Sequence, residues 1–206
     1  MNTDFDISSM GLDAAMRVRW LSVLGLFVVG GLAGALATIA SVEINRHTST
    51  EAFCTSCHSM AGLANDRHYV ASAHRSNAEG VRPSCGDCHI PKTNWFAETY
   101  THVASGVRDV WAEFTNNFSD PKIWDLRRVA LAHEVRDLMR RQDSITCRSC
   151  HAAADIRPTS ERGQAAHSLM REGRMTCIDC HFNLVHAPVP PTMEFIRGSG
   201  LGAQTK

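Results

Sequence analysis

All eight cysteines of this chain lie in four copies of one short motif, Cys-x-x-Cys-His. Two thiols three positions apart can bond to the two vinyl groups of one haem, and the histidine that follows then lies under the porphyrin, where its imidazole reaches the iron. The motifs therefore predict four covalently attached c-type haems. Their residues are Cys54, Cys57 and His58; Cys85, Cys88 and His89; Cys147, Cys150 and His151; and Cys177, Cys180 and His181.

Structural zinc is the alternative, because paired Cys-x-x-Cys units are common zinc ligands. Zinc does not require a histidine directly after the second cysteine, whereas all four units have one although the chain has only 11 histidines in 206 residues. We therefore favour haem. Covalent haem attachment in bacteria takes place outside the cytoplasm, so we expect the haem-bearing part in the periplasm.

The composition fits a haem-filled interior. Lys and Arg together number 21, as do Asp and Glu, so the net charge gives no indication of nucleic acid, and we expect no such partner. Aromatic residues make up only 7 % of the chain, too few for an ordinary core. No strand pattern of any length is present, so we expect a mostly α fold in which haems replace much of the apolar core.

An uncharged segment, residues 20–42, precedes the first motif. Its 23 residues exceed the roughly 20 that a helix needs to cross a bilayer. A cleaved signal peptide is the alternative, with a cleavage site at residues 35–37, but its apolar region would be only about 7–15 residues long. We favour a retained single-pass anchor in the cytoplasmic membrane, in contact with the lipid bilayer. Arg17 and Arg19 then make residues 1–19 a cytoplasmic tail by the positive-inside rule.

A duplication organises residues 43–187, the expected periplasmic tetrahaem domain. Sixteen residues separate His58 from His74, and sixteen separate His151 from His167. This spacing predicts two dihaem modules, at about residues 50–92 and 143–187, and gives His74 and His167 one shared role, that of second axial ligand to a haem iron. His186 follows the fourth motif by five residues and is the third candidate. The sequence does not assign these histidines to particular haems.

Two amphipathic helices connect the modules. Apolar residues recur every three or four positions in residues 94–116 and again in 122–142, within a connection that spans 94–142. Residues 117–121 separate the two, and Pro121 suits the first turn of the second helix. The prolines and glycines of residues 188–206 predict a disordered tail.

Taken together, these features resemble the NapC/NirT family of membrane-bound tetrahaem quinol dehydrogenases. The shared pattern is one N-terminal anchor, four motifs in two pairs, and Met60 two residues after the first motif, over about residues 18–187. The resemblance implies oxidation of a membrane quinol, menaquinol or ubiquinol, and electron delivery to a periplasmic reductase, most readily of the nitrate-reductase type. It also implies that Met60 binds the first haem iron. The alternative is that His58 binds that iron and Met60 only packs on the haem.

The family further places a basic residue and an acid seven positions apart near the first haem. Here these are His102 and Asp109. The basic residue is often lysine in the family, which leaves open whether His102 binds quinol or approaches the iron. Seven residues are about two helical turns, so both side chains share one helix face. An imidazole and a carboxylate there could accept the two protons that quinol oxidation releases.

Three other functions stay open at this stage. The same haems could carry electrons to quinone, could form a terminal reductase, or could belong to an anchor subunit that docks a nitrite or other reductase. The glycine spacing Gly30-x-x-x-Gly34 also leaves a homodimer open.

Overall fold

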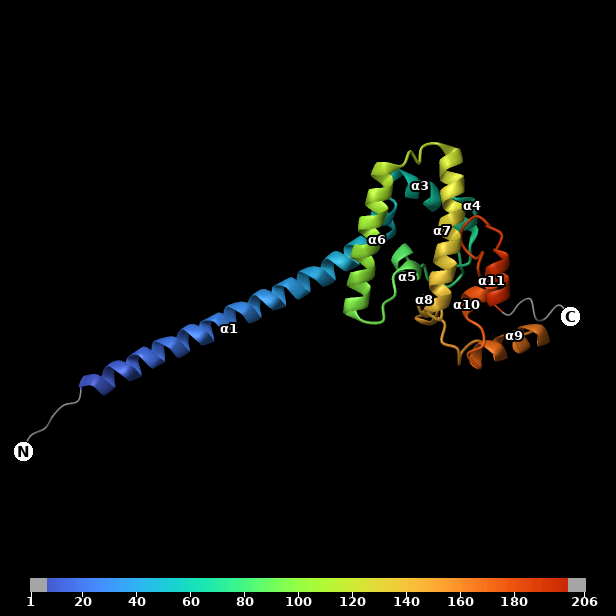
Figure 1. Ribbon diagram of the computed structural model, residues 1–206. Coiled ribbons are helices and arrows are strands. Elements are labelled where there is room, and N and C mark those ends of the chain that lie inside the picture. Colours follow the sequence, from blue (N-terminus) through green and yellow to red (C-terminus); the bar gives the residue numbers. More distant parts are fainter. Residues whose placement is uncertain (1–6, 200–206) are drawn as a thin grey trace, which may run out of the picture. The chain divides into compact units, whose positions relative to one another are not determined.

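The computed structural model describes residues 7–199, with the side chains of residues 7–15 and of His58 excepted. Residues 1–6 of the expected cytoplasmic tail and 200–206 of the expected C-terminal tail lie outside this range, as does the side chain of His58. The chain divides into an N-terminal unit that ends at Ile44 and a second unit that begins at Asn45. Figure 1 shows the helices of both.

Helix α1, Ile7–Thr48, contains the segment expected to cross the membrane. The candidate membrane span within it, Met16–Thr48, has 33 residues and contains an 18-residue stretch with a mean hydropathy of 2.2. At about 1.5 Å per residue, its uncharged residues 20–42 are about 35 Å long, enough to cross a bilayer core of about 30 Å. Within the span, the hydroxyls of Ser22, Thr38 and Ser41 donate to carbonyls three or four residues back. The span therefore leaves no side-chain hydroxyl unpaired in lipid.

The second unit is built of helices and loops, and no strand occurs between residues 45 and 199. The first expected module holds α2 (Glu51–Cys54), α3 (His58–Ala64), α4 (Arg67–Ala71) and α5 (Cys85–His89), and the second holds α8 (Ile145–Arg148), α9 (Glu161–Arg171) and α10 (Cys177–Cys180). A mostly α fold with one long apolar N-terminal helix is confirmed.

Between them, α6 (Trp95–Thr115) and α7 (Pro121–Arg141) confirm the two predicted connecting helices. Each begins at a side-chain cap, since Asn94 accepts from the amide of Ala97 and Asp120 accepts from that of Lys122. Pro121 occupies the first turn as expected. The two helices run antiparallel (Figure 1).

Few apolar side chains are buried in the described part of the chain. They are Tyr69, Met170, Met175, Ile178, Val189 and Phe195. None lies on α6, and the one buried residue of α7 is a charged one, Arg136. So small an apolar core agrees with the expectation that haems fill the interior.

The C-terminal segment differs from the sequence prediction. Residues 193–198 form helix α11 (Met193–Gly198), and Val189 and Phe195 expose only 2 % and 3 % of their surface. Arg136 donates to the carbonyl of Val189 at 2.7 Å, and the guanidinium of Arg140 lies 3.8 Å from the ring centre of Phe195. The expectation of disorder is therefore wrong for residues 188–199. Proline and glycine content did not reveal that two arginines of α7 bind this segment.

Arg140 joins three helices. Its Nε donates to Asp179 of α10 at 2.6 Å, its Nη2 donates to the carbonyl of Phe195 in α11 at 2.8 Å, and the Asp179 side chain is only 4 % exposed. Arg140→Ala leaves a buried carboxylate without its cation. We expect a loss of about 3 kcal/mol in the free energy of unfolding, at the low end for a broken buried pair because Arg140 is partly exposed.

The measurement is the urea midpoint of the haem-loaded full chain, followed by far-ultraviolet circular dichroism. The control is Arg141→Ala, the exposed neighbour on the same helix, which should change the stability by less than about 0.5 kcal/mol. Equal midpoints for the two variants would contradict the bridging role of Arg140.

Candidate haem centres

The two modules have the same local structure around their second motifs. In each, the third residue of the motif is an aspartate whose carboxylate accepts from the backbone amide of the N-cap residue, Asp87 from Ser84 and Asp179 from Thr176, both at 2.7 Å. A glycine precedes each motif in the left-handed region, Gly80 at φ 72° and Gly173 at φ 73°. These shared features support the duplication that the histidine spacing predicted.

Within each module the two motifs lie side by side. The Cys54 thiol is hydrogen-bonded to that of Cys85, and this bond lowers the pKa of the Cys85 thiol to about 7. Cys147 and Cys177 are hydrogen-bonded in the same way, which lowers the pKa of Cys177 to about 6. In the haem-loaded protein these sulfurs are thioethers, so their proximity reports how close the attachment points of neighbouring haems lie.

A glycine permits the close approach in the first module. The Gly86 amide donates to the carbonyl of Ser49 at 3.4 Å, and a Cβ at Gly86 would lie 2.7 Å from that of Ser49. Any larger residue would push α5 away from the segment that precedes the first motif. Helix α5, which carries the second motif, also contacts α8, which carries the first cysteine of the third. The four motifs are therefore neighbours in the order of the chain.

Six histidines form three facing pairs. The ring centres of His74 and His151 lie 6.1 Å apart, those of His89 and His186 6.2 Å apart, and those of His167 and His181 6.2 Å apart. Each pair joins one motif histidine to one of the three histidines that the sequence nominated as second ligands. Each histidine that the sequence nominated as a second axial ligand therefore lies opposite a motif histidine.

The separation fits one iron between each pair of rings. A metal–imidazole bond is about 2.0 Å long, and a ring nitrogen lies about 1.1 Å from its ring centre. Two such ligands on opposite sides of one metal therefore put the ring centres about 6.2 Å apart. The observed separations of 6.1–6.2 Å match this distance. The residues present consequently suit haems with two histidine ligands at the second, third and fourth motifs.

Two of the pairs cross between modules. His74 belongs to the first module and faces His151 of the second, while His186 of the second faces His89 of the first. His186 is close in sequence to the fourth motif, yet that motif's His181 faces His167. Distance along the chain was therefore a poor guide to the partner.

The protein around these histidines favours the uncharged imidazole that binds metals. Desolvation, and next the nearby His186, lower the pKa of His89 to about 4. Desolvation also lowers the pKa values of His181 and His186. His89 is nevertheless an exposed residue by its surface area.

Helix α6 turns its polar face toward the first motif. The Asp109 carboxylate acts electrostatically on Cys54, and Ser59, directly after the first motif, donates a hydrogen bond to Glu113. The Nδ1 atom of His102 is buried and has no hydrogen-bond partner among the described residues. Met60 is half-buried in α3, on the same stretch as Ser59.

The Asp109 carboxylate is 69 % exposed and lies 3.8 Å from the guanidinium of Arg108. Desolvation raises its pKa, although the charges of Arg108 and Arg127 oppose the shift. A raised pKa makes the carboxylate a stronger base than usual. Asp109 interacts with the first motif, and His102, seven residues earlier, lies on the same face of α6.

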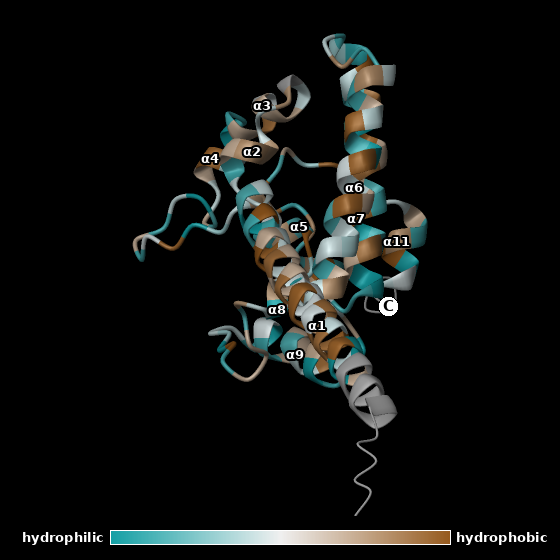
Figure 2. Ribbon diagram, turned by 90° about the vertical axis from the view of Figure 1, so that its left-hand side faces the viewer, coloured by the Kyte–Doolittle hydropathy of each residue, from teal (hydrophilic) through white to brown (hydrophobic). Residues whose placement is uncertain are grey.

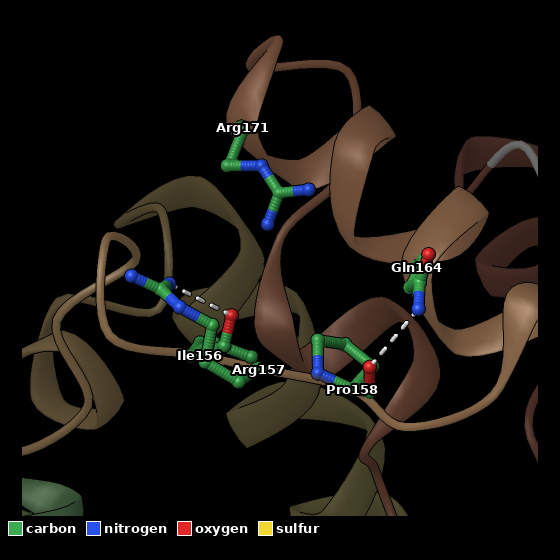
Figure 3. Close-up of a pocket in the computed structure, with 5 residues that line it drawn as sticks. All are labelled: Ile156, Arg157, Pro158, Gln164 and Arg171. Carbon is green, nitrogen blue, oxygen red and sulfur yellow. Dashed lines mark hydrogen bonds between the residues drawn. The ribbon is translucent and has the colours of Figure 1, made fainter.

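A cavity of about 340 Å³ lies in the second module (Figure 3). It is lined by Ile156, Arg157, Pro158, Gln164 and Arg171, and Gln164 donates to the carbonyl of Pro158 at 3.4 Å. Two guanidinium groups at one cavity suit an anion such as a haem propionate. Sequence reasoning did not nominate these arginines; the only signal was their position on either side of His167.

Comparison with known proteins supports this geometry. Residues 16–192 match the family model described as NapC/NirT cytochrome c family, N-terminal region. A probable tetraheme cytochrome c-type protein of Nitrosomonas europaea is 39 % identical over 82 % of this chain and 71 % of its own length. The denitrification system component NirT of Stutzerimonas stutzeri is 30 % identical over 80 % of this chain and 82 % of its own.

The cytochrome c-type protein TorY of Haemophilus influenzae is 36 % identical over 80 % of this chain but only 44 % of its own length. This chain therefore spans less than half of that relative. No solved structure matches the chain significantly. The cytochrome c match decides between the two metals that the motifs allowed, and the motifs carry c-type haem rather than zinc.

The facing pairs generate a spectroscopic prediction. His74→Ala and His186→Ala should each convert one of the four haems from low spin to high spin, because each removes one of two strong-field ligands. Electron paramagnetic resonance of the oxidised protein measures the change. His68→Ala, which removes a histidine outside the three pairs, is the control and should leave all spin states unchanged. An unchanged spectrum for His74→Ala would show that this ring does not bind iron.

Proposed function

The chain belongs to the NapC/NirT cytochrome c family, and on that premise we propose that it oxidises a membrane quinol and passes the electrons through four c-type haems to a periplasmic reductase. The observation that carries the proposal is the set of three histidine pairs at iron-binding separation, on motifs that neighbour one another in chain order. Helix α1 is the membrane anchor, and we place the haem domain on the periplasmic side.

The described residues divide into two functional parts. Bound haem supplies one-electron redox chemistry. His89 and His186, His151 and His74, and His181 and His167 would hold three irons with two strong ligands each, which suits electron transfer and leaves no position for a substrate. The substrate end is therefore the first motif, where we propose that Met60 binds the iron.

Proton acceptance is the task of α6. A quinol loses two electrons and two protons, while each haem iron takes only one electron, so the site must hold the substrate through two transfers. Asp109 acts on Cys54 and has a raised pKa, so its carboxylate can take a proton from a quinol hydroxyl near the first haem. The buried, unpartnered Nδ1 of His102 can accept a hydrogen bond from the second quinol hydroxyl and then its proton.

The electron acceptor is a periplasmic reductase, and we favour one that acts on a nitrogen oxide, of the nitrate-reductase type. The similarity to a relative named as a denitrification system component supports this choice. The fourth motif, farthest along the series from the first, is the exit to this partner.

Asp109→Asn tests the site without changing side-chain size. We expect all four haems to be retained and haem reduction by a menaquinol analogue to slow by about 100-fold or more, because the amide cannot accept a proton. Stopped-flow absorbance of the haem bands measures the rate. Dithionite, which needs no quinol site, should reduce the variant at the parental rate. Asp125→Asn, on the exposed side of α7, is the matched control and should oxidise quinol normally.

The parental rate should also depend on pH through Asp109. Because the pKa of Asp109 is raised, protonation sets in at a higher pH than for an ordinary aspartate. The rate should therefore fall as the pH falls through that pKa, and Asp109→Asn should lack this dependence. Parental quinol oxidation by Asp109→Asn would refute the proposed role.

His102→Ala separates the two roles that the sequence left open. If His102 binds quinol, the variant should show a raised KM for quinol and unchanged haem spectra. If the imidazole instead binds the first iron, the spectrum of one haem will change as well. Unchanged kinetics together with unchanged spectra would rule out both roles.

A further inference from the structure

Helix α6 exposes its apolar face. Seven apolar residues of this helix are more than half exposed, from Val110 at 51 % to Phe114 at 84 %. They are Phe96, Tyr100, Val103, Val107, Val110, Trp111 and Phe114, and we call them the outer face of α6. Figure 2 shows brown, hydrophobic bands along this helix. An amphipathic helix ordinarily buries such a stripe against its own core.

A haem at the first motif does not account for this exposure. At 100° per residue, the seven side chains fall within an arc of about 100°, and the charged residues of the helix all lie outside it. Asp109 and Glu113, which approach the first motif, lie on the opposite side of the helix axis. A haem at that motif would cover the polar face and leave the outer face uncovered.

One hydrogen bond links α6 to the residues that directly follow the anchor. Asn45, the first residue of the second unit, donates from Nδ2 to Oγ1 of Thr99 at 2.8 Å. Only Glu43 and Ile44 separate Asn45 from the end of the uncharged span, which is about 5 Å of helix. The hydrogen bond therefore ties Thr99, in the first part of α6, to a residue that follows the uncharged span by three positions.

The chemistry of the outer face matches the membrane–water boundary. It carries no charge, and Tyr100 and Trp111 are amphipathic aromatic residues of the kind enriched at that boundary. Helices with one strongly apolar face and one charged face lie in the plane of the membrane, with the apolar face about 5–10 Å deep. Exposed apolar patches of this extent mark interaction sites in general.

We propose that α6 lies along the membrane surface with its outer face in the lipid, so that the protein contacts the bilayer through a second helix besides its anchor. The inference rests on the anchor and on the exposed face. It does not depend on quinol oxidation, because the test below measures lipid contact and not activity.

The test places a photoreactive benzophenone amino acid at single positions of the haem-loaded full chain in phosphatidylethanolamine–phosphatidylglycerol nanodiscs. The test positions are Phe96, Val107 and Phe114, which sample both ends and the middle of the outer face. Leu32 in the span is the positive control, and Met193, 64 % exposed on α11, is the negative control. Mass spectrometry after illumination identifies what each position has cross-linked, and haem absorbance confirms that each variant is loaded.

Lipid adducts at all three test positions and at Leu32, with none at Met193, are the expected result. Adducts to a second copy of the chain at Val107 would mean that a homodimer covers the outer face, and would overturn the proposal. Lipid adducts at Phe96 but not at Phe114 would also overturn it, because the helix would then stand away from the membrane.

Discussion

Pairs of histidine rings at the separation that one iron requires are the constraint on which the rest of this structure depends. The described part of the chain buries only six apolar side chains, far fewer than a domain of this length ordinarily needs. Three histidine pairs, two of them between modules, instead join segments up to about a hundred residues apart in sequence. Metal binding free energy is then also folding free energy. The helices need not pack tightly against one another, because each needs only to carry its cysteines and histidines to the right position.

The parts of this arrangement that are local in sequence could be predicted, and the parts that depend on distant contacts could not. The motifs gave the haem attachment, the period of residues 94–142 gave α6 and α7, and the repeat nominated His74 and His167 as ligands. The partners of His74 and His186 lie in the other module, and no spacing rule reports that. The order of residues 188–199 depends on Arg136 and Arg140, whose side chains reach it from α7. Proline and glycine content therefore gave the wrong prediction for residues 188–199, because hydrogen bonds from two guanidinium groups hold this segment.

Helix α6 shows a second limit of prediction from the spacing of apolar residues. Its periodicity correctly predicted an amphipathic helix, but period alone does not say which face is buried. Here the polar face, with His102 and Asp109, approaches the first motif, and the apolar face is exposed. The reversal makes sense if the protein interior at this point is a site for a polar reaction and the surroundings are lipid.

The pairing of His167 breaks the symmetry of the duplication. His74 and His167 occupy equivalent positions, yet His74 faces the first motif of the other module whereas His167 faces the second motif of its own. Had the ancestral pairing been kept on both sides, His167 would have faced the motif that begins at Cys54. Its departure removes the histidine that symmetry would have supplied there. Two alike halves thus form an asymmetric path for electrons, and the proposed quinol entry lies at the end where the symmetric histidine is not supplied.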